Sequence, residues 1–367
     1  MEQIVIRGRG CLNQGNIAGL LEQMNMRCPM LVCSARMQSD IVGRLGLACP
    51  VFSGYHANPD LADASAGAEM YRSHGCDGLI SVGGGSAMDT AKAVKALLLA
   101  GDMEAVKASR LPEGALPHIA IPGTAGTGAE ATPIAVVYVN NEKLSLDHPA
   151  LLPEAIVLDS TLLDTLPLYH KKACAMDALC QGIESYWAVK ATAESRIHAE
   201  RAILGVLRNL DAYLAGDAAA ADAVLEAAYE SGCAIRISRT TAAHAMSYQI
   251  TKRIGPAHGH ACMLTLPHLW RHMGDAPVLT ALNALMGTTN GADLLLCMLA
   301  ALDMLPDAQP DDALLDALAA SVNVQRLGNH PEKLTAAQLR EIYAAAFQPI
   351  EEDERARLAA LWRHYAG

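Results

Sequence analysis

The chain has 367 residues, 51% of them hydrophobic and 18% charged, a composition that supports a large core and excludes general disorder. The formal net charge of −11 argues against a nucleic-acid surface and against binding to anionic lipid. No apolar run approaches the roughly 18 residues that a membrane-spanning helix needs, and the first residues lack the basic and apolar regions of a signal peptide. We therefore expect a cytoplasmic protein that binds neither nucleic acid nor membrane and keeps its ten cysteines reduced.

The first part of the chain alternates short apolar runs with helical patterns. Strands are expected at residues 3–6, 30–33, 51–52, 78–82 and 118–121, and helices with apolar residues at 3.6-residue spacing at 17–24, 39–47, 61–74 and 87–99. This alternation predicts a parallel, doubly wound sheet. Residues 134–139 and 143–146 flank a short polar turn and predict a β-hairpin. Residues 155–158 follow as a last strand.

The pattern changes near Asp159, after which Ala- and Leu-rich helical segments follow one another with almost no β-branched runs. The length is also that of two domains. We therefore predict an α/β domain with a parallel doubly wound sheet at residues 1–159 and an all-helical domain at residues 160–367.

A glycine-rich turn, Ser81-Val-Gly-Gly-Gly-Ser-Ala-Met-Asp-Thr-Ala-Lys92, joins a predicted strand to a helix that is expected to start at about Ala87. Backbone N–H groups at a helix start, with no side chains in the way, form a site for a pyrophosphate. The alternative is an ordinary tight turn that Ser86 caps, and the Rossmann GxGxxG pattern is absent.

A second small-residue segment, Pro122-Gly-Thr-Ala-Gly-Thr-Gly-Ala-Glu-Ala-Thr-Pro133, follows the next strand. It supplies hydroxyl groups and bare backbone at the sheet edge where α/β proteins bind ligands. Two such segments at successive strand ends predict a dinucleotide site.

These two segments resemble the cofactor segments of the iron-containing (group III) alcohol dehydrogenase family. Tyr55-His-Ala-Asn-Pro59 is similar to the family's Asn-Pro before a helix, and Leu166-Pro167 to its Leu-Pro. The resemblance covers residues 1–270 in order and implies NAD(P)H and one divalent metal, with Fe²⁺ expected and Zn²⁺ or Mn²⁺ as alternatives. It also implies a homodimer. The cofactor contacts it implies are Asn58, Gly84, Gly85, Ser86, Asp89, Thr124, Thr127 and Lys143.

Four residues in three separate segments are candidate metal ligands. Asp177 and Gln181 share one helix face at i, i+4 spacing, His244 lies in another predicted helix, and His258 enters the next. Taken singly, each is also compatible with a core role. The resemblance implies that Asp177, His244 and His258 bind the metal, with Gln181 where the family usually has His. An amide oxygen is a weaker and harder ligand than imidazole, so affinity and preference for zinc are expected to fall.

Candidate catalytic and substrate-binding residues lie close to these histidines. Tyr248 stands where many family members have a His near the reacting carbon, so it is either a proton donor or a wall of the pocket. No acidic residue occurs between Glu230 and Asp275, whereas Arg239, Lys252 and Arg253 bracket the two ligands. These three predict a pocket for an anionic head group. The alternative is that they lie on solvated helix faces.

Residues 136–147, 177–181 and 238–244 resemble the phosphonoacetaldehyde reductase branch of the family. A sulfoacetaldehyde reductase needs nearly the same pocket. We therefore expect interconversion of a small anionic aldehyde and a primary alcohol. Alternatives are a general short-chain alcohol dehydrogenase, a relative acting on a sugar or polyol phosphate (glycerol phosphate dehydrogenase or a dehydroquinate-synthase-like lyase), and a non-catalytic nucleotide-binding protein that has lost its metal.

The choice of nicotinamide depends on the end of the predicted strand at residues 30–33. The family's NAD-preferring pattern has Asp there to accept hydrogen bonds from the ribose hydroxyls, whereas this chain has Ser34-Ala35-Arg36. Ser34 leaves room for a 2′-phosphate and Arg36 can accommodate its charge. We expect NADPH to be accepted. The alternative is that Arg36 simply begins the next helix.

Overall fold

The computed structural model describes residues 3–108, 110–112, 116–140, 142–307, 309–323 and 327–366. Contacts group the chain into two compact units, Met1–Thr165 and Leu166–Gly367. The short helix η3 (Ser160–Leu163) groups with the first unit because Leu162 is part of that unit's hydrophobic core. Asp159, immediately before it, accepts hydrogen bonds from the backbone N–H groups of Gly10 and Leu12.

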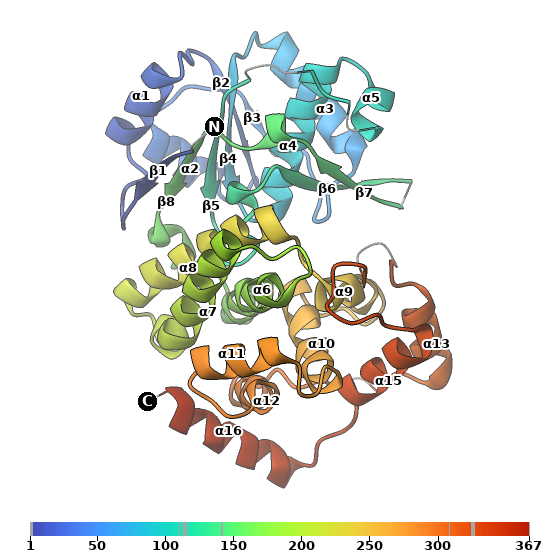
Figure 1. Ribbon diagram of the computed structural model, residues 1–367. Coiled ribbons are helices and arrows are strands. Elements are labelled where there is room, and N and C mark those ends of the chain that lie inside the picture. The colour runs from blue at the N-terminus through green and yellow to red at the C-terminus, as the bar shows by residue number, and fades with distance from the viewer. Residues whose placement is uncertain are drawn as a thin grey trace. The chain divides into compact units, whose positions relative to one another are not determined.

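The described part of the first unit is built on a parallel six-stranded sheet, in the order β1-β8-β5-β4-β2-β3 (Figure 1). Its strands are β1 (Ile4–Arg7), β2 (Pro29–Cys33), β3 (Val51–Phe52), β4 (Gly78–Gly83), β5 (His118–Pro122) and β8 (Ala155–Leu158). The predicted parallel sheet is confirmed. Because the strands are parallel, the carboxyl ends of β2, β4 and β5 lie at one edge of the sheet.

Helices cover both faces of this sheet (Figure 1). Leu31 and Cys33 of β2 pack in one core cluster with residues of α1 and α2, whereas Met30 and Val32 pack in another with residues of α3 and α4. Alternate side chains of a strand point to opposite faces, so the sheet is doubly wound, as predicted. The helices are α1 (Gln14–Gln23), α2 (Gln38–Leu45), α3 (Leu61–Ser73), α4 (Gly85–Ala100) and α5 (Met103–Lys107).

The predicted β-hairpin is also confirmed. It consists of the antiparallel strands β6 (Ile134–Val139) and β7 (Glu142–Asp147). Asn140 enters the turn with φ +51°, and Asn141, which was expected in the same turn, lies outside the described residues. The hairpin belongs to the core formed with α3 and α4 because Val137 and Leu146 are buried there.

In the described part of the second unit every regular element is a helix, which confirms the predicted helical fold. The helices are α6 (Leu168–Trp187), α7 (Ala193–Leu214), α8 (Ala218–Ser238), α9 (Ala242–Arg253), α10 (His258–His272), α11 (Pro277–Leu285), α12 (Gly291–Ala301), α13 (Asp312–Ala320), α15 (Ala336–Ala346) and α16 (Glu352–Ala366). Helix α6 packs against α7, α8 and α10 (Figure 1). A Cβ atom on Gly182 would lie only 3.0 Å from Ile203, so the missing side chain lets α6 and α7 approach closely.

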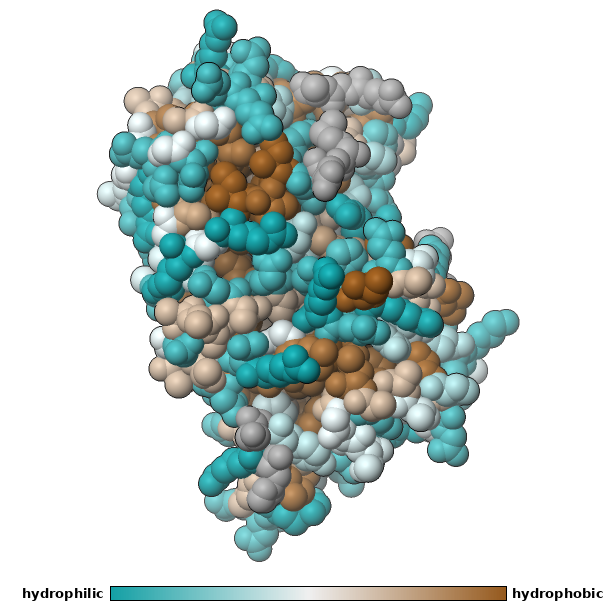
Figure 2. Space-filling model, turned by 60° about the vertical axis from the view of Figure 1, so that its left-hand side comes forward, coloured by the Kyte–Doolittle hydropathy of each residue, from teal (hydrophilic) through white to brown (hydrophobic). Residues whose placement is uncertain are grey.

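On the face drawn in Figure 2, apolar side chains form separate brown groups within a mostly hydrophilic surface. The large apolar residues that remain exposed are spread over different segments: Leu168, Tyr169, Val189, Ile197, Leu361 and Tyr365. Among the described residues, no helix is both long enough and apolar enough to cross a membrane.

Candidate nucleotide and metal sites

The glycine-rich turn leads from β4 into α4. Gly83 has φ +145°, which favours glycine, and a Cβ atom there would lie 3.0 Å from the Cβ atom of Ala87. Helix α4 begins at Gly85, about two residues earlier than expected, with Gly84 as its N-cap residue. Ser86 therefore lies inside the helix, and no side chain caps the N-terminus. The uncapped amide groups suit an anion, which these helix positions bind readily.

The second small-residue segment packs directly against this turn. A Cβ atom on Gly84 would lie 3.3 Å from Cγ2 and Oγ1 of Thr124, and one on Gly85 would lie 3.3 Å from Cγ2 of Thr127. Strands β4 and β5 are neighbours in register, with Gly83 opposite Pro122. Both predicted segments therefore line one cradle that larger side chains would fill, and this cradle fits a pyrophosphate group.

Ser34 lies at the same edge of the sheet as the glycine-rich turn. It follows β2, which pairs with β4 so that Cys33 stands opposite Val82. Arg36 is exposed and lies in a turn, because α2 begins only at Gln38. Arg36 therefore lies just before α2 on the solvent-exposed surface, where the alternative of a solvated position also places it.

Asp89 and Lys143, two further residues expected to contact the cofactor, lie in one charged group. Burial raises the pKa of Asp89 to about 6, although Lys92 and Lys143 act in the opposite direction. Lys92 is buried and donates hydrogen bonds to the carbonyl oxygens of Ala129 at 2.6 Å and Ile134 at 2.7 Å. Lys92 thus ties α4 to the segment that follows the second glycine run.

Asn58 lies in the loop between β3 and α3, where it is exposed and has φ +58°. The next residue, Pro59, accepts a hydrogen bond from the backbone N–H of Tyr138 at 2.9 Å. This bond connects the Asn58 loop to the hairpin strand β6.

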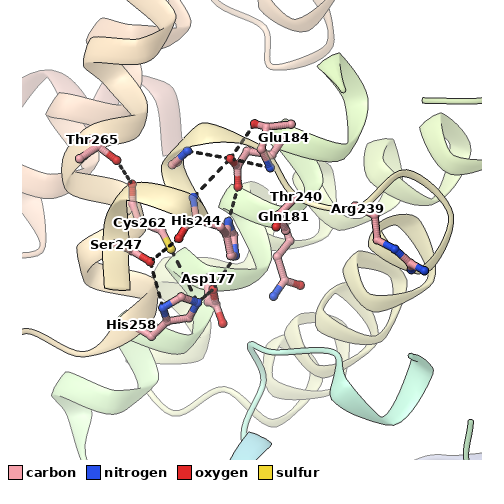
Figure 3. A network of polar contacts seen from close by, with 12 residues as sticks. Asp177, Gln181, Glu184, Arg239, Thr240, His244, Ser247, His258, Cys262 and Thr265 are labelled. Carbon is pink, nitrogen blue, oxygen red and sulfur yellow. Dashed lines mark hydrogen bonds and ion pairs between the residues drawn. The ribbon is translucent and has the colours of Figure 1, made fainter. Parts of the chain in front are cut away.

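In the second unit, three helices bring four potential metal ligands together (Figure 3). Asp177 comes from α6, His244 from α9, and His258 and Cys262 from α10, and their donor atoms all lie within 4.8 Å of one another. Oδ1 of Asp177 lies 3.3 Å from Nε2 of His244 and 3.9 Å from Nε2 of His258. The structure thus assembles three of the predicted ligands.

Two buried atoms of this cluster suit a cation. Oδ1 of Asp177 and Nε2 of His244 are buried without a hydrogen-bond partner. An unsatisfied buried carboxylate oxygen or imidazole nitrogen is costly. A divalent ion held by Asp177, His244 and His258 would satisfy both atoms, so the residues present fit a metal.

Gly259 explains how α10 comes so close to α6. A Cβ atom at this position would lie 2.1 Å from the carbonyl oxygen of Ala173 and 2.6 Å from Cβ of Asp177. Any larger residue would push the two helices apart. The glycine therefore allows His258, the preceding residue, to reach Asp177.

Hydrogen bonds set the orientation of both histidine rings. The hydroxyl group of Ser247 donates to the carbonyl oxygen of His244 at 2.9 Å, and its oxygen lies 3.2 Å from Nδ1 of His258. Because the Ser247 proton is already used, Nδ1 of His258 must donate the second bond. Nε2 of His258 is then left with a lone pair for a metal.

Glu184 orients the other histidine, and sequence reasoning missed it. One oxygen of its carboxylate accepts a hydrogen bond from Nδ1 of His244 (Figure 3). The other accepts from the backbone N–H groups of Thr241 at 3.1 Å and Ala243 at 2.8 Å, at the start of α9. The available signal was its position seven residues after Asp177, which places both on one face of α6.

The two carboxylates have lowered pKa values in spite of their burial. Burial by itself raises the pKa of Asp177, but His258 and His244 more than offset it and hold the pKa below its usual range. For Glu184, burial again raises the pKa, but His244 and the surrounding hydrogen bonds outweigh this effect and hold the pKa below its usual value. Both groups are therefore ionised at neutral pH, as a metal site requires.

Gln181, the predicted fourth ligand, lies one turn after Asp177 on α6 and is buried. Its amide oxygen accepts a hydrogen bond from the hydroxyl group of Ser231 at 2.8 Å. To bind a metal, this oxygen has to give up that bond or the amide has to rotate.

Tyr248 packs against the cluster. Its ring stacks on that of His258, with centroids 5.5 Å apart and an angle of 11° between the planes. This contact restricts the His258 ring, which also meets the ring of His244 edge-on.

Arg239 ends α8 in an unusual backbone conformation, with φ +65° and ψ 171°. This region is normally restricted to glycine and costs other residues about 1–3 kcal/mol. Asn329 holds the strained segment by donating to the carbonyl oxygens of Ser238 and Thr240. Nη1 of Arg239 donates to the carbonyl oxygen of Arg236 at 2.6 Å. In Figure 3 the side chain extends away from the metal cluster.

Lys252 and Arg253 lie farther off. They occupy the last turn of α9 and are exposed, and Nε of Arg253 donates to Gln249 at 2.9 Å. His244 is in the first turn of the same helix, so about 12 Å of helix rise separates it from Lys252. Along α9 these two basic residues are therefore remote from His244.

Comparison with known proteins identifies two matching family models. Residues 3–160 match the iron-containing alcohol dehydrogenase model, and residues 172–347 match the C-terminal model of the Fe-containing alcohol dehydrogenase family. The chain is 39% identical over 236 residues to a phosphonoacetaldehyde reductase of Streptomyces viridochromogenes, an alignment that covers 60% of each protein. It is 30% identical over 250 residues to a lactaldehyde reductase of Escherichia coli, covering 65% of this chain and 64% of that one.

A solved structure is similar over nearly the whole chain. The sulfoacetaldehyde reductase of Bifidobacterium kashiwanohense, in complex with NAD⁺, matches with a TM-score of 0.87 and 26% identity, covering 95% of this chain and 98% of that one. The alignment with the first curated relative spans only 60% of that relative's length. Together, the two family models and this structural match place the chain in the iron-containing alcohol dehydrogenase family.

Proposed function

We propose that the protein is a metal-dependent NAD(P)H oxidoreductase that interconverts a short aldehyde with an anionic head group and the corresponding primary alcohol. In the reducing direction, a hydride passes from NAD(P)H to the carbonyl carbon, and a proton from solvent completes the alcohol. The observation that carries the proposal is the cluster of Asp177, His244 and His258, whose donor atoms lie close together. Two of these atoms, Oδ1 of Asp177 and Nε2 of His244, are buried without a hydrogen-bond partner.

The proposed metal site is held by Asp177, His244 and His258, with Fe²⁺ as the proposed ion. A divalent ion supplies Lewis acidity to a carbonyl oxygen when it is bound there. Glu184 and Ser247 keep the two imidazoles in the tautomer that directs Nε2 inward. The ionised carboxylate of Asp177 contributes the negative charge that retains a cation.

The proposed nicotinamide site uses the cradle of the first unit. Backbone amides of Gly85 and Ser86 receive the pyrophosphate at the uncapped start of α4, and Thr124 and Thr127 line its other side. We propose that Asn58, Asp89 and Lys143 complete the cofactor contacts, and that Ser34 and Arg36 admit a 2′-phosphate.

Arg239 is the proposed contact for the anionic head group of the substrate. This role is supported by the strained backbone of Arg239, because such strain is retained where a residue has a function. The named relatives also include a phosphonoacetaldehyde reductase and a sulfoacetaldehyde reductase. We propose that Arg239 binds the phosphonate or sulfonate.

A second candidate is a reductase of small neutral aldehydes. It is favoured by the positions of Lys252 and Arg253, which lie on the exposed last turn of α9, far along the helix from His244. The match to a lactaldehyde reductase also fits this reading.

One experiment separates the two candidates. The anaerobically purified, metal-loaded protein is assayed for NADH and NADPH oxidation with phosphonoacetaldehyde, sulfoacetaldehyde and a neutral aldehyde of equal length. Higher kcat/KM for the anionic pair supports the first candidate, and equal values support the second. No turnover of any aldehyde would overturn both. We further propose a cytoplasmic homodimer, which light scattering of the purified protein tests.

A further inference from the structure

Cys262 is a buried residue of α10 that the proposed function does not use. It lies one helical turn after His258, so both side chains share a face of α10. Its sulfur lies 3.9 Å from Nε2 of His258 (Figure 3). It is also the fourth member of the cluster in which every donor atom lies within 4.8 Å of the others.

The separations known among these atoms are close to those of a tetrahedral ligand set, and all lie within 4.8 Å. Metal–nitrogen and metal–oxygen bonds of about 2.0–2.1 Å place two ligand atoms about 3.4 Å apart, and a metal–sulfur bond of about 2.3 Å widens this to about 3.6 Å. The observed separations are 3.3 Å for His244 to Asp177, 3.9 Å for His258 to Asp177, and 3.9 Å for Cys262 to His258. Small side-chain adjustments would bring all four onto one ion.

Two neighbouring buried atoms point to a ligand at this place. Oδ1 of Asp177 and Nε2 of His244 are unpartnered although both residues are less than 5% exposed. The competing donor, Gln181, already has its amide oxygen bonded to Ser231. In the view of Figure 3, Gln181 lies on the opposite side of the His244 ring from Cys262.

We infer that the thiolate of Cys262, rather than the amide of Gln181, is the fourth protein ligand of the metal. This inference rests on the proposed metal site. When the metal binds, the sulfur–hydrogen bond breaks, a sulfur–metal bond forms, and the proton leaves to the buffer. A four-ligand site of this kind can still expand to five ligands when a substrate oxygen binds.

A thiolate also changes which metal the site prefers. Soft sulfur ligands favour zinc, whereas oxygen ligands favour harder ions. A site of Asp177, His244, His258 and Cys262 therefore selects zinc more strongly than one completed by Gln181. This is the reverse of the preference expected from the Gln181 substitution alone.

Cobalt substitution tests the inference without relying on activity. The full-length protein is stripped with a chelator and titrated anaerobically with Co²⁺. Visible absorption reports Co²⁺ bound at the site, and a near-ultraviolet sulfur-to-cobalt charge-transfer band reports a thiolate ligand. The wild-type protein is expected to show both signals with one Co²⁺ per chain and to release a proton.

Cys262→Ser is expected to lose the charge-transfer band and to bind Co²⁺ at least about a hundredfold more weakly, since even supporting partners of a ligand account for about ten- to a hundredfold. Cys180→Ser is the matched control, because Cys180 is a neighbouring buried thiol on α6 outside the cluster. It should keep both signals. Circular dichroism checks folding, and Cys262→Ala serves as a second variant.

The possible outcomes distinguish a failure of the Cys262 assignment from a failure of the proposed metal site. Visible bands without a charge-transfer band in the wild-type protein, or a band that persists in Cys262→Ser, would overturn the role of Cys262 while leaving the metal site intact. No uptake of Co²⁺ by the wild-type protein would overturn the metal site itself, and the proposed function with it.

Discussion

Nδ1 of His244 donates a hydrogen bond to the carboxylate of Glu184, which also accepts hydrogen bonds from backbone N–H groups at the start of α9. One buried acid from α6 therefore both orients a proposed metal ligand and caps the helix that carries it.

Glu184→Gln tests this dual role. The amide keeps the size of the side chain but removes its charge, so it no longer stabilises the imidazole tautomer with Nε2 directed inward. Loss of such a partner lowers metal affinity by about ten- to a hundredfold. Competition with a fluorescent chelator measures this, and unchanged affinity would leave Glu184 with only its capping role. The variant is expected to keep the stability of α9 while it binds the metal more weakly.

His258→Ala tests the metal site directly. The variant is expected to lose both bound metal and turnover, because one of three proposed ligands is gone. The side chain is 37% exposed, so its removal should lower the free energy of unfolding by only about 1 kcal/mol or less. Metal content by mass spectrometry and thermal unfolding separate the two effects. A variant that stays fully active after chelation contradicts the assignment.

Substitutions of Gln181 test whether its amide only lines the site or binds the metal. Gln181→Ala is expected to leave metal affinity within about threefold, because its amide oxygen is bonded to Ser231. Gln181→His should tighten binding by about tenfold or more, since it offers the metal an imidazole in addition to Cys262. A metal titration of both variants decides the point. A large loss in Gln181→Ala would show that the amide oxygen is a ligand after all.

Arg239→Gly separates the anion-binding role from the backbone strain. Glycine adopts φ +65° without penalty, so the variant should not be less stable than the wild-type protein. Losing one charge-assisted contact costs about 1.5–3 kcal/mol, or roughly ten- to a hundredfold in kcat/KM for an anionic aldehyde. A neutral aldehyde of equal size should be unaffected. Equal losses for both substrates would leave Arg239 with a structural role only.

Ser34→Asp tests the choice of nicotinamide. Ser34 follows β2 at the sheet edge that carries the glycine-rich turn. A carboxylate there would repel a 2′-phosphate and accept hydrogen bonds from the ribose hydroxyls instead. We expect the ratio of kcat/KM for NADPH over NADH to fall by about tenfold, which corresponds to about 1.4 kcal/mol. A wild-type protein that uses NADH alone would contradict the prediction.

The amino-acid sequence by itself determined the architecture of each unit. Alternating apolar runs and helical periodicity located the parallel sheet, the hairpin and the helical second half, because these patterns are local and repeat along the chain. Glycine runs after β4 and β5 marked the cradle for the same reason: bare backbone at a strand end is visible in the residues themselves. The spacing of Asp177, His244 and His258 marked the metal site only through its resemblance to a family.

Only the tertiary structure decided which side chains meet. Gly259 lets α10 approach α6 closely enough for His258 to reach Asp177, and the same approach brings Cys262 into the cluster. Closeness along the chain, by contrast, does not by itself place Lys252 beside His244, because the rise of α9 separates the two residues. Helical periodicity reports which residues share a face, whereas the distance between faces is set by packing, which depends on residues far apart in the sequence.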